Sequence, residues 1–67
     1  MNKYRIIRNA IRCKHCGDVI ESKHRHDYVS CRCGRVAVDG GLDYLRRSFP
    51  SMPAEEHYEE LSAVVEE

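Results

Sequence analysis

The chain has 67 residues, with 11 Lys and Arg against 11 Asp and Glu, so its formal net charge is zero. This length allows one small domain at most, and below roughly 70–80 residues a hydrophobic core rarely supplies more than ~3–5 kcal/mol of stability. A structural metal or disulfides are therefore expected. The first twenty residues show no apolar run of signal-peptide or membrane-span length, so we expect a protein of a reducing cytoplasm with no membrane partner.

The zero net charge conceals two opposite ends. Residues 1–50 hold all 11 Lys and Arg against five Asp and Glu, which gives +6, whereas residues 51–67 hold six Glu and no Lys or Arg, which gives −6. An asymmetry of this kind favours a role in binding. We expect residues 1–50 to form the domain and residues 51–67 to form an acidic extension.

Short β-branched clusters in the first half of the chain predict strands. KYRIIR at 3–8 is the first, followed by a turn at Asn9 and Ala10. DVIES, DYVSC and RVAVD continue the pattern, with KHRH as a polar turn between the first two. Asp39-Gly40-Gly41 is a turn signal, because glycine tolerates a positive φ.

After this turn the apolar spacing becomes helical. Leu42, Leu45 and Phe49 predict a short helix ended by Pro50. Residues 51–67 predict a second, acidic amphipathic helix, with Pro53 in its first turn and an apolar stripe from Ala54 to Val65. The predicted fold is thus a small metal-stabilised α+β domain of zinc-ribbon-like β-hairpins, with one short and one C-terminal helix.

Two cysteine pairs supply the metal. Cys13 and Cys16 stand in CKHCG, and Cys31 and Cys33 stand in CRCG, each inside an apolar–polar–Cys–turn–Cys–Gly–polar order. In a reducing cytoplasm, such pairs are more typical of metal ligands than of disulfides or free thiols. We expect one structural Zn²⁺ held by all four sulfurs at ~2.3 Å. The missing residue in CRCG predicts a second turn that is distorted relative to the first.

Other ligands and metals are weaker alternatives. His15, His24 and His26 lie in or between the cysteine pairs and are expected at the surface, and a rubredoxin-type iron site would use the same four sulfurs. Four cysteines close a tetrahedral shell, whereas a catalytic zinc keeps one position for water. We therefore expect no enzymatic activity.

Residues 11–47 carry a more specific pattern, in which CxxCG, a short hairpin and CxCG lead into VDGGxDYLRR. This pattern resembles a family of short phage and prophage proteins, chiefly from Gram-positive bacteria. The resemblance implies a phage-related origin and a cysteine-ligated metal. Within its last part, Tyr44, Arg46 and Arg47 are a candidate contact face, since Tyr and Arg are favoured interface anchors. Local packing of the predicted helix by Leu42 and Leu45 is the competing explanation.

Three functions fit these features. The first is a non-catalytic accessory protein that binds a host or defence protein. The second is a nucleic-acid-binding zinc ribbon whose acidic tail is autoinhibitory, because the basic residues of the ribbon could neutralise phosphates. The third is pairing of the opposite charges within the chain or across a homodimer.

Overall fold

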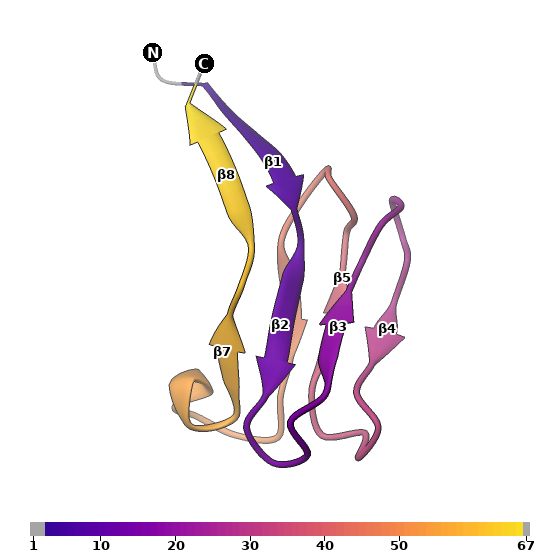
Figure 1. Cartoon of the computed structure of the whole chain (residues 1–67), viewed down its shortest axis with the longest axis vertical. Coiled ribbons are helices and arrows are strands. Elements are labelled where there is room, and N and C mark those ends of the chain that lie inside the picture. The colour runs from indigo at the N-terminus through magenta and orange to yellow at the C-terminus, as the bar shows by residue number, and fades with distance from the viewer. Residues whose placement is uncertain (1–2, 67) are drawn as a thin grey trace.

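The computed structural model describes residues 3–66, which form eight short strands and one turn of 3₁₀-helix (Figure 1). In chain order the elements are β1 (Tyr4–Arg8), β2 (Ala10–Cys13), β3 (Val19–Glu21), β4 (Val29–Ser30), β5 (Ala37–Asp39), β6 (Arg46–Ser48), η1 (Ala54–Glu56), β7 (Tyr58–Glu60) and β8 (Ala63–Glu66). The strands predicted in the first half of the chain are confirmed as β1, β3, β4 and β5.

The strands form three small antiparallel sheets. β2 lies between β3 and β7, β5 lies between β4 and β6, and β1 pairs with β8 in a two-stranded ribbon. Figure 1 shows this ribbon reaching beyond the two three-stranded sheets, and Tyr4 pairs with Glu66 at its tip. The first and last strands of the chain therefore meet.

The buried core is small and lies close to the cysteine pairs. Its fully buried side chains include Ile11, Val36 and Val38, with Ile20, Cys13 and Cys31 around them. Phe49 and Tyr58 pack against this cluster from outside, with ring centroids 5.9 Å apart. A core of this size needs additional stabilisation.

The short helix predicted after Asp39-Gly40-Gly41 is wrong. The segment makes a turn and then strand β6, whose residues pair with β5 from Asp39↔Arg46 to Ala37↔Ser48. Leu42 and Leu45 are 52% and 42% exposed, so they do not pack a helix against the ribbon. Within β6 the side chains alternate, with Arg46 and Ser48 exposed and Arg47 more buried. Helix and strand are hard to separate in so short a run, and here cross-strand pairing decides.

The C-terminal helix predicted over residues 51–67 is also wrong. This segment holds the 3₁₀ turn η1 and strands β7 and β8, while Glu67 lies outside the described residues. An isolated helix of this length is marginal in water, whereas β1 and β2 offer a row of unpaired backbone groups along one edge. Backbone pairing with that edge outweighs helix propensity. Within residues 3–66, no helix is long and apolar enough to span a membrane.

Candidate metal centre

The first cysteine pair lies in the turn between β2 and β3. The backbone N–H of Cys13 donates to the Asp18 carbonyl at 2.8 Å, which closes the turn, and Gly17 N–H donates to the Cys13 carbonyl at 2.9 Å. Gly17 has φ +76°, a conformation that glycine adopts without strain. The N–H groups of His15 and Cys16 point at Cys13 Sγ, at 3.3 and 3.4 Å. Such donors favour the thiolate form that binds metal.

The second pair lies between β4 and β5 in a turn of the same overall length. Cys31 N–H donates to the Val36 carbonyl at 3.0 Å, so each turn is closed five residues after its first cysteine. Inside the turn, Gly34 N–H reaches the carbonyl of Cys31 three residues back, whereas the corresponding bond at Gly17 spans four. The predicted difference between the turns is thus a local tightening around Cys33. One residue fewer before Gly34 is balanced by one more after it.

The two turns bring four sulfur atoms together. The Sγ atoms of Cys13, Cys16, Cys31 and Cys33 all lie within 4.8 Å of one another. The Cys13–Cys33 and Cys31–Cys33 sulfurs are 3.7 and 3.4 Å apart, close to the ~3.8 Å between ligands on a tetrahedral zinc. None of the four is in a disulfide. The cluster therefore fits a metal ion, and the sequence-predicted ligand set is brought together at one place.

The thiols perturb one another strongly. Burial opposes ionisation of Cys31, but hydrogen bonds from the Val36 backbone and from neighbouring thiols outweigh it and lower the pKa of Cys31 to about 6. At Cys33 a hydrogen bond from the Arg35 backbone favours the thiolate. Desolvation and the neighbouring thiols outweigh that bond and raise the pKa of Cys33 to about 11. Four thiolates at these separations repel one another, and a bound cation removes that cost.

The histidines lie outside the cluster. In the described part of the chain, the four cysteines are the only group of three or more metal-binding side chains whose ligand atoms converge. His15 Nε2 lies 2.9 Å from His57 Nδ1, and His26 Nδ1 lies 3.1 Å from the Tyr44 hydroxyl. These rings make contacts with other side chains instead of converging on the sulfurs.

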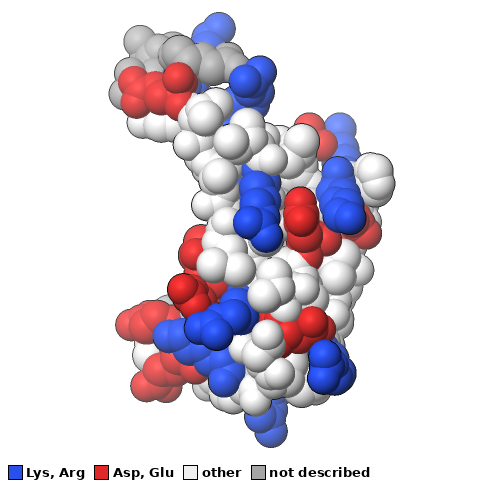
Figure 2. Space-filling model, viewed as in Figure 1, with Lys and Arg blue, Asp and Glu red and all other residues white. Residues whose placement is uncertain are grey.

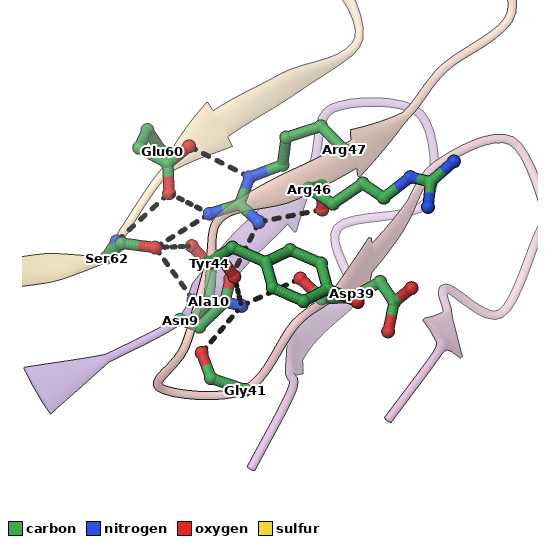
Figure 3. A network of polar contacts seen from close by, with 9 residues as sticks. All are labelled: Asn9, Ala10, Asp39, Gly41, Tyr44, Arg46, Arg47, Glu60 and Ser62. Atoms are coloured by element: carbon green, nitrogen blue, oxygen red, sulfur yellow. Dashed lines mark hydrogen bonds and ion pairs between the residues drawn. The ribbon is translucent and has the colours of Figure 1, made fainter. Parts of the chain in front are cut away.

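A second feature is a buried polar network that sequence reasoning missed (Figure 3). Asn9 is fully buried, and its Nδ2 donates to the carbonyls of Asp39, Gly41 and Tyr44 at 3.0, 2.9 and 3.2 Å. Its Oδ1 accepts from Arg47 Nη1 at 2.7 Å. In the sequence Asn9 reads as a turn residue, and nothing in RIIRNAIR marks it as the centre of a network.

The predicted contact residues fall in three different environments. The Arg47 side chain is 8% exposed and forks onto Glu60, with Nε–Oε1 and Nη2–Oε2 distances of 3.0 and 2.6 Å. Tyr44 is half-buried beside His26. Arg46 is exposed, and within residues 3–66 its guanidinium has no hydrogen-bonding or ion-pair partner. Whether these three form a contact face stays a prediction.

Arg46 borders a shallow hollow on the sheet β4–β5–β6. The hollow has a volume of about 340 Å³ and is lined by side chains that include Tyr28, Asp39 and Ser48. Tyr28 is 60% exposed. An exposed aromatic ring beside a free guanidinium and a carboxylate gives this face both apolar and charged contacts to offer.

Opposite charges are interspersed over the face that Figure 2 shows. Among the residues that the structure describes, the ion pairs Arg12–Glu59 at 2.7 Å and Arg47–Glu60 at 2.6 Å join the basic part of the chain to its acidic end. Part of the charge asymmetry of the sequence is therefore neutralised within the chain.

Comparison with known proteins gives a family. A family model described as a domain of unknown function, DUF7695, matches residues 5–49, which span β1 to β6 and all four cysteines. No curated protein and no solved structure matches the chain. With two thirds of its length covered by the family model, the chain belongs to the family of the domain of unknown function DUF7695.

Proposed function

We propose that this protein is a small zinc-stabilised binding module of phage type, which has no catalytic activity of its own and acts by binding a host or defence protein in the bacterial cytoplasm. The observation that carries the proposal is the set of four converging thiols. Four protein ligands fill a tetrahedral zinc, which leaves no position for a substrate or a reactive water. The metal would then act as a staple.

With zinc in a structural role, the binding activity lies on the protein surface. The hollow on β4–β5–β6 offers Tyr28 and Arg46, two residue types favoured at the centres of interfaces. Arg46 is uncommitted within the described residues, so a partner carboxylate can pair with it without breaking an internal contact. Zinc is proposed in preference to iron because closed four-cysteine sites are typical of structural zinc.

The proposal is tested by affinity capture from the producing bacterium, comparing the wild type with Arg46→Glu. Lys23→Glu is the matched control, because it makes the same charge change at an exposed residue away from the hollow. We expect a stoichiometric protein partner that Arg46→Glu loses and Lys23→Glu retains. Equal capture by all three proteins, or no partner in any of them, would contradict the proposal.

Nucleic-acid binding is a second candidate, favoured by the two ion pairs that hold the acidic end against Arg12 and Arg47. An autoinhibitory tail would make such pairs. Binding of this kind weakens steeply as salt rises, because phosphate contacts release counterions. Titration of a fluorescent oligonucleotide at low and at physiological salt, with the full chain and with a chain lacking residues 51–67, tests it, and no binding by either protein at low salt would remove it.

A further inference from the structure

We propose that the edge formed by β1 and β2 is a docking site for an extended acidic segment of a partner protein, and that residues 58–66 of this chain occupy that site as an exchangeable internal strand. The name docking edge is used below for residues 4–13, and C-terminal strand for residues 58–66. This inference rests on the proposed function and adds a second contact surface, besides the hollow beside Arg46, together with the chemistry of the partner segment that binds there.

The C-terminal strand lies along the docking edge over its whole length. β7 pairs with β2 from Cys13↔Tyr58 to Ile11↔Glu60, and β8 pairs with β1 from Arg8↔Ala63 to Tyr4↔Glu66. Between them the Leu61 N–H donates to the Ala10 carbonyl at 3.0 Å. Figure 1 shows β7 and β8 following one side of β2 and β1. Such strand addition to a sheet edge is a general mode of peptide binding.

Arg12 of the docking edge and Arg47 of β6, which lies beside the edge, bind acidic side chains of the C-terminal strand. Arg12 donates through Nε and Nη2 to Glu59 Oε1 on one face, and Arg47 forks onto both oxygens of Glu60. The Ser62 hydroxyl then accepts from Ala10 N–H at 3.0 Å and from Arg47 Nη2 at 2.8 Å (Figure 3). The edge thus selects two consecutive carboxylates followed, after one intervening residue, by a hydroxyl.

The C-terminal strand contributes little to the core. Among residues 3–66, every buried residue lies between Asn9 and Gly41, and none after Pro50 is buried. The strand is held by backbone hydrogen bonds, by Tyr58 packed against the edge of the core, and by ion pairs whose glutamates are 49% and 46% exposed. Elements held in this way open more readily than core strands. The family match also ends at residue 49, before the strand begins.

The positive charges beside the docking edge explain why its occupant is an acidic polypeptide. The side chains that read it are arginines, and the fork of Arg47 onto Glu60 has the geometry of planar carboxylate recognition. The backbone pairing requires a polypeptide partner, because a nucleic acid has no peptide groups that could pair with a strand. An internal strand competes with such a partner at an effective concentration of about millimolar, so partner binding needs the strand to open.

The test uses the full-length protein with zinc and a fluorescent peptide of residues 57–66, followed by fluorescence anisotropy. Glu59→Arg with Glu60→Arg repels the internal strand from Arg12 and Arg47 and exposes the edge. The matched control is Glu55→Arg with Glu56→Arg, which makes the same charge change in η1, where neither carboxylate has a hydrogen bond or ion pair within residues 3–66. Bound zinc and far-UV circular dichroism establish that each variant is folded.

We expect the peptide to bind the Glu59/Glu60 variant at least about tenfold more tightly than the Glu55/Glu56 control. A peptide with both glutamates changed to Gln should lose most of that gain. Equal binding to the two variants would overturn the inference, as would a gain seen with oligo(dT) and not with the peptide. If these results overturn the inference while a partner is still captured through Arg46, the proposed function is unaffected.

If the Glu59/Glu60 variant fails to fold, amide hydrogen exchange in the wild type decides. We expect the Leu61 N–H to exchange at least about tenfold faster than the N–H groups of Ser22 and Cys31, which bond within the core region to Asn9 and Val36. Exchange of Leu61 at the same rate as these two would mean that the strand opens only with global unfolding, and would overturn the inference.

Discussion

Replacing Asn9 by Ala should destabilise the protein strongly. The substitution removes the Nδ2 donor shared by three backbone carbonyls and the Oδ1 acceptor of Arg47. No small residue can replace these four contacts, since Asn9 is fully buried.

The expected cost follows from how deeply each contact is buried. Only the bond to the Gly41 carbonyl is fully buried, and the other three are part-buried. A fully buried unsatisfied group costs about 1–3 kcal/mol and part-buried ones cost less, while Arg47 keeps Glu60 and Ser62 as partners. The sum is about 4 kcal/mol. Total stability for a chain of this length is roughly 3–10 kcal/mol, so the variant should be marginally folded.

The assay is urea denaturation at fixed excess zinc, followed by far-UV circular dichroism, because a metal that binds the folded state stabilises it by mass action. Lys23→Ala is the control for a solvent-exposed residue and should change the free energy of unfolding by less than about 0.5 kcal/mol. Asn9→Ala within about 1 kcal/mol of the wild type would refute the reasoning, since the network would then add nothing to the fold.

Three further predictions concern the turn, the ion pair and the ligands. Gly41→Ala should cost several times the ~1 kcal/mol of Gly34→Ala in the same urea assay, because a Cβ on Gly41 overlaps the backbone of His24 whereas one on Gly34 meets open space; equal costs would contradict this. Burial raises the pKa of Glu60, but hydrogen bonds from Arg47 and Ser62 outweigh it and lower that pKa below 4.5. The stabilisation is then complete above pH 4.5 and is lost as pH falls through the lower folded pKa, so the stability difference between wild type and Glu60→Gln should shrink below that pH; a constant difference would count against the pair. Cys33→Ser should lower zinc affinity by more than about tenfold in a chelator competition, since even changes around zinc ligands cost 10–100-fold, and an unchanged affinity would remove Cys33 from the ligand set.

The cluster of four cysteines was predictable because its signal is local. Each cysteine pair lies within one turn, and the glycine after each pair supplies the positive φ that the turn requires. The sequence order therefore sets most of the geometry. Only the structure shows that CKHCGD and CRCGRV form turns of equal length, each closed by a hydrogen bond from the first cysteine N–H to the carbonyl five residues later.

The second half of the chain was mispredicted because its partners are distant in sequence. Arg46–Ser48 is a strand because β5 pairs with it, and Tyr58–Glu66 is extended because an edge some 50 residues earlier accepts it. The helical spacing of apolar residues in LDYLRRSF and in the acidic tail gives no information about those partner strands. Tertiary context overrides weak local preference in segments of this length.

The glycines of the DGG turn have a second role that the sequence alone did not reveal. Both were expected to form a turn, and they do, at φ +106° and +55°. Their second role is close approach, since Gly40 lies against the Tyr44 backbone and Gly41 against that of His24. This approach lets Asn9 reach the carbonyls around it, so the turn and the buried network are one structural unit.

The measurement that tests the central claim most directly is the metal content of freshly purified protein, taken together with its count of reactive thiols. The account predicts about one zinc per chain and four thiols that react only after the metal is chelated. Protein that is folded with well under one metal ion per chain, and whose thiols react at once or are paired as disulfides, would contradict it.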